Sequence, residues 1–305
     1  MSRFLLRRLR QTLLLLFLLS LFVFLLFELI PGDYLTEMEL NPSVSTQRVE
    51  QLRSQYGLDK PFYVQYFLWL KAVASGNLGY SFAQQRPAAA LISERMLNTL
   101  LLSTVAFLMT LLMVFPIGIF SALYSGRWPD RLGSAFSLLG LSFPPLLLAL
   151  FALYFAFASR WFPLGGLGGP RHWILPGLVL ALPLAAYLIR QLRLEMIDAL
   201  QQPYVLAAAA RGLSSTRIVR HALRGALNPL ISMLGLSWGA LLGGAVVVEK
   251  IFNWPGLGLL LVESILSRDL FVALNSILVS ALLVIFSTLL ADLLLAWNDP
   301  RIRYQ

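Results

Sequence analysis

The 305-residue sequence contains no cysteine and only two histidines, His172 and His221, which are far apart in the chain. The absence of cysteine excludes disulfides, thiolate metal sites and cysteine nucleophiles. We expect no metal centre. Charged residues are also scarce, at 13% of the chain, while hydrophobic residues make up 58%. An average soluble domain has about 25% and about 45–50% of these two classes, so the composition predicts a membrane protein.

Several motifs of catalysis and nucleotide binding are missing. There is no Gly-Lys dipeptide, so the chain lacks the G-x-x-x-x-G-K-[ST] loop that cradles nucleotide phosphates. There is also no HExxH, and no pair of histidines or carboxylates at a catalytic spacing within one apolar segment. We therefore predict neither an ATPase site nor a membrane-embedded enzyme, and no catalytic residue.

Six apolar segments are long enough, or nearly long enough, to cross a bilayer, which takes about twenty residues. They are residues 11–30, 99–124, 132–158, 173–189, 226–248 and 270–297. The fourth segment is short and contains Pro176 and Pro183, and its helix has room to run on through Arg190 and Leu194 into the aqueous phase. The first segment follows a basic start, which raises the alternative of a signal peptide. Its apolar run exceeds the signal core of about 7–15 residues, and no small-x-small cleavage site precedes Pro31.

Basic residues gather on one side of these spans. With the N-terminus inside, the inner segments are 1–10, 125–131, 190–225 and 298–305, which hold 14 basic and 4 acidic residues. The outer segments are 31–98, 159–172 and 249–269, which hold 10 basic and 9 acidic residues. An excess of Lys and Arg in cytoplasmic loops sets membrane orientation. We predict that both termini are cytoplasmic and that the net charge of +9 reflects this orientation, with no nucleic-acid partner.

The predicted fold is an all-α integral membrane protein with six transmembrane helices and an outer insertion between the first two. The expected divisions are 1–30 (cytoplasmic N-terminus and first span), 31–98 (periplasmic region), 99–297 (five-span core, with an inner loop at 193–225) and 298–305 (cytoplasmic tail).

The inner loop after the fourth span combines small and basic residues. Pro203 suits the first turn of a helix, and the four alanines at 207–210 have high helix propensity. Gly212 suits a left-handed C-terminal cap, and Ser214 or Ser215 is placed to cap a second, short helix. On a helical wheel the basic and apolar residues of this second helix fall on opposite faces. The basic ones are Arg217, Arg220, His221 and Arg224, and the apolar ones are Ile218, Val219, Ala222 and Leu223.

Two interpretations of this loop remain open on periodicity alone. Its second helix could lie on the membrane, with the apolar face in the headgroups and the arginines near anionic lipid. Alternatively, the alanines at 207–210 and Gly212 offer a surface of small side chains that another protein can approach closely. The second interpretation predicts a docking site.

The sequence of this loop resembles a known family. The stretch YVLAAAARGLSSTRIVRHALRGALNP, followed by GLSWGALLGGAVVVEKIFNWPGLGLLLVESILSRDL and the terminal DPRIRY, is similar to the permease subunits of bacterial dipeptide, oligopeptide and nickel importers of the ATP-binding-cassette (ABC) class. The start MSRFLLRRLRQTLLLLFLLSLFVFLLFELIPGD, the outer YGLDKPFYVQYFLWL with GNLGYSF, and ERMLNTL fit the same family. The resemblance therefore covers the chain from end to end, and implies the fold of a type I ABC importer permease.

The resemblance implies that the inner loop inserts into a cleft on the ATPase subunit. The family signature is Glu-Ala-Ala followed, three residues on, by Gly. Ala207, Ala208 and Gly212 match it, whereas Leu206 stands in place of the acid and puts an ion pair there in doubt. The implied coupling residues are Tyr204, Ala207, Ala208, Ala209, Arg211, Gly212, Leu213, Ser214 and Arg217, with Arg220 as a further polar contact.

The resemblance also implies the partners and the mechanism. The partners are a second homologous permease, two ATPases that hydrolyse Mg-ATP, a periplasmic or lipid-anchored substrate-binding protein, and membrane lipid, in a bacterial inner membrane. No internal repeat supplies a second half within this chain, and this chain binds no cofactor itself. The implied mechanism is alternating access, in which local kinks of the spans contribute. The candidate kink positions are Pro116, Pro144, Pro145, Pro176, Pro183 and the glycine-rich GLSWGALLGG. The substrate class implied is di- or oligopeptides, with nickel chelates or opines as alternatives.

Two outer segments are expected to face the binding protein. Residues 31–98 show helix-like apolar spacing at Val64, Phe67 and Leu68 and a turn at residues 75–77. The segment EKIFNWPGLG supplies candidates for a gate under the substrate path, or for a loop that only caps the fifth span. These candidates are Glu249, Trp254, Pro255 and Gly256.

Two acids, Glu28 and Asp292, lie within the predicted spans. Buried carboxylates in a membrane are costly, so both are candidates for the transport pathway. They also keep open a proton- or sodium-coupled carrier, which needs no ATPase. Against that alternative, the middles of all six spans are uncharged.

Overall fold

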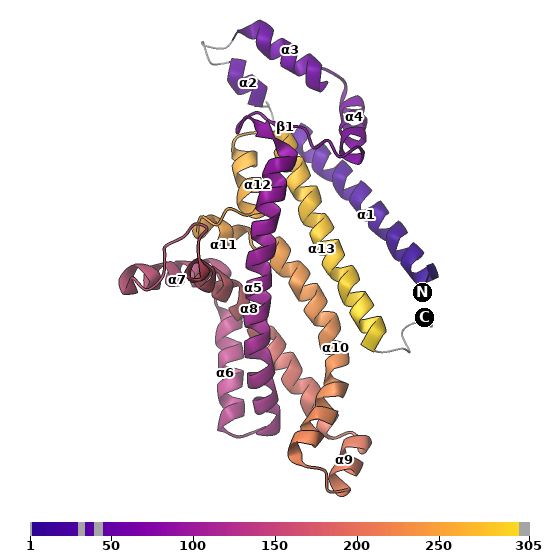
Figure 1. The fold of residues 1–305 in the computed structure, drawn as a ribbon, viewed down its shortest axis with the longest axis vertical. Coiled ribbons are helices and arrows are strands. Elements are labelled where there is room, and N and C mark those ends of the chain that lie inside the picture. Colours follow the sequence, from indigo (N-terminus) through magenta and orange to yellow (C-terminus); the bar gives the residue numbers. More distant parts are fainter. Residues whose placement is uncertain (1, 30–33, 40–44, 299–305) are drawn as a thin grey trace. The chain divides into compact units, whose positions relative to one another are not determined.

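The computed structural model describes residues 2–29, 34–39 and 45–298, whose regular structure is helical apart from one short hairpin (Figure 1). The helices are α1 (Ser2–Glu28), α2 (Tyr34–Glu39), α3 (Thr46–Tyr56), α4 (Phe62–Ala74), α5 (Ala88–Leu123), α6 (Trp128–Ser142), α7 (Pro145–Ser159), α8 (Pro170–Leu200), α9 (Pro203–Ala210), α10 (Ser215–Gly244), α11 (Val246–Ile251), α12 (Leu257–Leu266) and α13 (Leu270–Asn298). The strands β1 (Tyr80–Ser81) and β2 (Arg86–Pro87) pair antiparallel. Nearly all of the predicted tail at 298–305 lies outside the described residues.

The helices confirm an all-α membrane protein, with one change to the predicted spans. Within the described residues, five helices are long and apolar enough to cross a bilayer, and a sixth span is present only if α6 and α7 count as one. These two helices meet at a bend of 102° within the predicted third span, at two of the prolines that were candidates for kinks. The break falls at Pro144 and Pro145, because proline has no N–H to continue the helix and restricts the residue before it.

The chain divides into two compact units. The first contains residues up to Thr99 together with Pro255–Leu282, and the second contains Leu100–Trp254 together with the chain from Leu283 onward. The long helices α5 and α13 contribute to both units.

In the first unit, aromatic residues attach the outer region to α1. Phe24 of α1 packs on Tyr66 and Trp69 of α4, with ring centroids 5.4 and 5.6 Å apart. The α4 helix and the turn after it confirm the predicted helical spacing and turn. The buried face of α4 carries Tyr66 and Trp69, while Phe67 and Leu68 are exposed.

The hairpin is tied to the start of α13 by a buried acid. Ser81 donates a hydrogen bond of 2.5 Å to the Asp269 carboxylate, and the Ala83 N–H donates another at 3.3 Å. Burial raises the pKa of Asp269, while these hydrogen bonds act in the opposite direction. Asn275 continues the attachment, because its side-chain amide donates to the Leu78 carbonyl at 2.9 Å.

In the second unit, α8 is the central helix. It runs for 31 residues through both Pro176 and Pro183, which confirms that the fourth span continues beyond its apolar part. Helices α6 and α10 both pack against α8. Its buried residues Leu188, Leu192 and Met196 form a continuous core with α10.

Small residues let the second-unit part of α13 approach α10 closely. Gly235, Gly239 and Gly243 repeat every four residues on α10, so they line one face of the helix. A Cβ added at Gly235 would collide with Ala291, and one at Gly239 would lie 2.7 Å from the Ser287 hydroxyl oxygen. The glycines therefore serve helix packing, as in small-xxx-small contacts of membrane helices. The helix remains continuous through them up to Gly244.

An ion pair joins α6 to the last turns of α8. The Arg193 guanidinium donates two hydrogen bonds to Asp130, of 2.5 and 2.7 Å, and the Gly126 N–H donates a third at 2.8 Å. Asp130 is only 6% exposed. This fork–fork geometry fixes the position of α8 just before the inner loop begins.

The close packing of the α10 glycines against α13 can be tested with the same substitution at two of these positions. We expect Gly235→Ala to destabilise the protein by about 1–3 kcal/mol, because the added methyl overpacks the contact with Ala291. Gly243→Ala is the matched control, since its Cβ would lie 3.9 Å from the nearest side chain, that of Val284. Thermal unfolding in detergent measures both. Equal melting temperatures for the two variants would contradict the close packing.

The ion pair can be tested by removing one partner. We expect Arg193→Gln to lower the free energy of unfolding by about 2–3 kcal/mol. This loss is smaller than for a fully buried pair, because the Arg193 side chain is 24% exposed. The loss arises because Asp130 stays buried without its cation. Adding Asp130→Asn should recover part of the stability, and Arg190→Gln, an exposed change on the same helix, should have little effect. A thermal shift no larger for Arg193→Gln than for Arg190→Gln would disprove the contribution.

Candidate functional site: the inner helix-turn-helix

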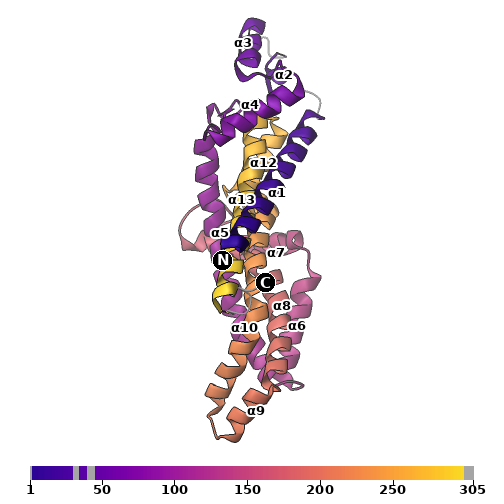
Figure 2. The same cartoon turned by 90° about the vertical axis from the view of Figure 1, so that its right-hand side faces the viewer.

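The inner loop folds as a helix, a tight turn and a second helix. After α8 ends at Leu200, the short α9 begins at Pro203, with Gln202 in the extended N-cap position. A four-residue turn then leads into α10 at Ser215. Within the second unit, α9 and its turn extend past the ends of α8 and α10 in both views (Figures 1 and 2). This arrangement confirms the predicted helix, glycine turn and helix.

The turn is closed by backbone hydrogen bonds around Gly212. The Gly212 N–H donates to the Ala209 carbonyl at 2.9 Å, and the Leu213 N–H donates to the Ala208 carbonyl at 3.3 Å. These two bonds form a Schellman motif, which requires a left-handed residue after the helix cap. Gly212 supplies it with φ +79°, and no atom lies within 4 Å of the position of an added Cβ. The glycine is therefore needed for its backbone, and the space beside it is open.

Buried apolar residues fasten the turn to the rest of the second unit. Val205 of α9 is 2% exposed and belongs to the same core as Ala199 at the end of α8 and Ala222 of α10. Tyr204 packs its hydroxyl end over Gly225, where any Cβ would collide with it. The short helix α9 is thus held from both sides, which an isolated helix of eight residues needs in order to be stable.

The outer surface of this element carries small and basic side chains. Ala208 and Leu213 are half-buried. The exposed coupling candidates are Tyr204, Ala207, Ala209, Arg211, Gly212, Ser214 and Arg217, and Leu206 and Ala210 are exposed beside them. Arg220, His221 and Arg224 are also exposed, which confirms the predicted basic face. The element therefore presents a positively charged surface with small side chains, at which another backbone can approach closely.

Three details of the loop differ from the sequence prediction. The second helix is not short, because α10 continues without a break through Pro229 into the fifth span. Ser214 occupies the N-cap position, but its hydroxyl makes no capping hydrogen bond. The apolar face is not left for lipid headgroups, since Ala222 is fully buried and Ile218 packs against the same core.

The gate candidates lie in a packed segment. Trp254 and Glu249 have no exposed surface in the second unit, and the Trp254 N–H donates to the Glu249 carbonyl at 2.8 Å. In the first unit, the Pro255 carbonyl accepts a hydrogen bond of 2.7 Å from Asn98, and Gly256 is the N-cap of α12. Their proposed role as a gate stays a prediction, and in this conformation they form part of the packed structure.

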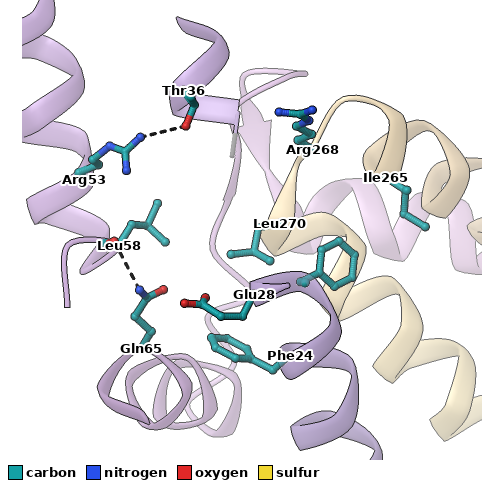
Figure 3. A pocket seen from close by; sticks show the side chains of 10 residues that line it. Phe24, Glu28, Thr36, Arg53, Leu58, Gln65, Ile265, Arg268 and Leu270 are labelled. Atoms are coloured by element: carbon teal, nitrogen blue, oxygen red, sulfur yellow. Dashed lines mark hydrogen bonds between the residues drawn. The ribbon is translucent and has the colours of Figure 1, made fainter. Parts of the chain in front are cut away.

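The two membrane acids lie in different surroundings. Glu28 is exposed at the end of α1, on the wall of a cavity of about 470 Å³ within the first unit. Figure 3 shows its carboxylate among Phe24, Gln65 and Leu58, with Arg53 and Arg268 on other walls. Asp292 is half-buried in the second-unit part of α13. A role of either acid in transport remains a prediction.

The Asp130–Arg193 pair was not identified from the sequence. Its members are 63 residues apart, and each belongs to an inner segment in which exposed charges are expected. No local spacing marks a contact of this kind. The attachment of Pro255 to Asn98 was missed for the same reason.

Comparison with known proteins supplies independent information. The family profile "Binding-protein-dependent transport system inner membrane component" matches residues 114–304, and the profile of the N-terminal region of such membrane components matches residues 1–103. The glutathione transport system permease protein GsiC of Shigella flexneri serotype 5b is 38% identical over 307 residues, and that of Escherichia coli K12 is 37% identical. Both alignments cover 100% of this chain and of the relative.

A solved structure shows the same fold. The chain superposes on a chain of the MetNI methionine ABC transporter in an inward-facing conformation with a TM-score of 0.61, at 18% identity. The match covers 70% of this chain and 98% of the other. The family profile and the full-length relatives decide between an ABC importer and an ion-coupled carrier, because an ion-coupled carrier has no place in a binding-protein-dependent system. The chain belongs to the family of inner-membrane components of binding-protein-dependent transport systems, and is a permease subunit of a bacterial ABC importer.

Proposed function

We propose that this permease moves short peptides across the inner membrane and that its inner helix-turn-helix is the coupling element for the ATPase. The observation that supports the coupling role is that the surface of residues 207–212 is largely exposed while its base, formed by Val205 of α9 and Ala222 of α10, is buried. A surface of small side chains accepts a protein cleft, and a rigid base transmits displacement to α8 and α10. The same chain supplies no nucleotide-binding loop, so the work must come from a partner.

The proposed assembly pairs this chain with a second homologous permease and two ATPase subunits. ATP binding closes the ATPases, which displaces the docked loops and switches the permeases between inward-facing and outward-facing states. A binding protein, periplasmic or lipid-anchored, delivers substrate to the outer side. The first-unit segment that includes α2, α3 and α4 is its proposed landing surface, because it is the largest outer region of the chain.

The proposed substrate class is short peptides, including glutathione. The support is similarity at 37–38% identity over the full length to permeases named for glutathione transport, since glutathione is a tripeptide. Nickel chelates and opines are the alternatives, because importers of these substrates share the motifs of the chain.

The coupling role predicts the effect of adding bulk to the alanine surface. Ala207→Trp should abolish co-purification of the ATPase subunits and ATP-driven uptake, because the indole blocks close approach of the cleft. The matched control for recovery of the ATPase is Ala90→Trp, which adds the same side chain at an exposed position near the outer start of α5. Both variants should insert into the membrane at wild-type levels. Normal ATPase recovery with Ala207→Trp would contradict the docking role.

Bulk and backbone strain can be separated at the turn. Gly212→Val should disturb the turn, because a β-branched residue disfavours φ +79°, whereas Gly212→Asn tolerates this conformation. If the turn geometry is what the ATPase recognises, uptake should fall much more in the valine variant than in the asparagine variant. Wild-type uptake in the valine variant would show that the left-handed turn is dispensable.

The substrate proposal predicts a selective uptake defect. Cells lacking the gene should lose uptake of labelled glutathione or of a labelled short peptide, and retain uptake of nickel and of octopine. Re-expression of the wild-type chain should restore the lost uptake, and the Ala207→Trp variant should not. Loss of nickel or octopine uptake with unchanged peptide and glutathione uptake would overturn the peptide assignment without affecting the coupling role.

A further inference from the structure

A groove runs along the cytoplasmic ends of α5 and α6 in the second unit. Its volume is about 860 Å³, and its lining is mostly apolar. The α5 side is formed by Pro116, Ile117 and Phe120, the turn by Tyr124 and Arg127, and the α6 side by Trp128, Pro129, Leu132, Gly133 and Phe136. None of these residues takes part in the coupling element described above.

The groove is built by one close contact and several large side chains. Gly133 of α6 lies directly against Ser121 of α5, so any Cβ at Gly133 would collide with the hydroxyl. Large side chains then project beside this contact, since Phe120 is 56% exposed and Leu132 is 61% exposed. Phe120 and Tyr124 stack with an interplanar angle of 8° and form a flat apolar wall.

Polar and charged groups occur only at the cytoplasmic end of the groove. Arg127 lines it there, and Arg131, one helical turn further on, is also exposed. Asp130 lies between them in sequence, but it is buried and its charge is balanced by Arg193. The mouth of the groove therefore carries a net positive charge. Trp128, 71% exposed at the same level, is typical of the membrane–water interface.

This distribution matches one kind of molecule. An amphiphile with an anionic head would place its negative charge at Arg127 and its acyl chain along Phe120, Leu132 and Phe136. Basic pockets at the cytoplasmic side of membrane helices bind the headgroups of anionic lipids. We propose that the groove between α5 and α6 is a binding site for an anionic phospholipid. A bound lipid would hold together the two helices whose junction carries Asp130, and thus the pair with Arg193.

The experiment measures thermal stabilisation of the complete detergent-purified transporter by added lipid. Phosphatidylglycerol and phosphatidylcholine with the same acyl chains are compared, so that only the headgroup charge differs. We expect phosphatidylglycerol to raise the melting temperature more than phosphatidylcholine does. In Arg127→Gln this difference should fall at least about twofold, because the interaction of one basic side chain with the anionic headgroup is lost. Arg171→Gln, which removes an exposed arginine at the outer end of α8, should leave it unchanged.

A second measurement locates the lipid directly. Phosphatidylglycerol with a photoactivatable acyl chain should label residues between Pro116 and Phe136, and Leu132→Trp, which fills the groove, should abolish that labelling. Equal stabilisation by the two lipids, or an undiminished difference in Arg127→Gln, would overturn the proposal. Crosslinking of a reporter at Leu132 to the second permease subunit would also overturn it, because the groove would then be a protein interface.

Discussion

The burial of Val205 and Ala222 in one core with the end of α8 is the interaction on which the proposed mechanism depends. A loop of small exposed residues transmits no displacement unless its base is rigid. Here the base is packed on both sides, the turn is closed by a Schellman motif at Gly212, and α10 continues into the membrane as one helix. A displacement applied to α9 therefore acts on α8 and α10 together, because closely packed interiors do not deform continuously.

Two further sets of helix contacts in the second unit keep this base aligned. The Asp130–Arg193 pair attaches α6 to α8 one to two turns before the loop, and the stripe from Gly235 to Gly243 seats α10 against its part of α13. Hydrophobic attraction between helices is weak in lipid, so close contact and polar pairs carry more of the specificity. The proposed lipid groove lies at the same α5–α6 junction that carries Asp130, which would make the alignment of the base sensitive to lipid composition.

Much of this architecture could be predicted from the sequence because the bilayer imposes strong local rules. Long apolar segments predicted the spans, and the distribution of arginine predicted the orientation. Pro203, the four alanines and Gly212 predicted a helix followed by a turn in the inner loop. What failed depends on contacts between distant residues. Pro144 and Pro145 were candidates for a kink, but the 102° size of the bend was not predictable from them. The pairing of Asp130 with Arg193 leaves no periodic signal, and the apolar face at the start of α10 has the same pattern whether it contacts lipid or protein. The exposed side of the turn was predicted in outline, whereas the residues that hold it were not.

The most direct test of the account uses the natural absence of cysteine, which makes a single introduced thiol unambiguous. In Leu206→Cys, a thiol replaces a side chain that is 57% exposed on α9. A membrane-impermeant maleimide should label it only from the cytoplasmic side, and a short bifunctional crosslinker should join it to an ATPase subunit and stop ATP-driven uptake. Labelling from the periplasmic side, or full uptake with the loop crosslinked to no ATPase subunit, would contradict the coupling role.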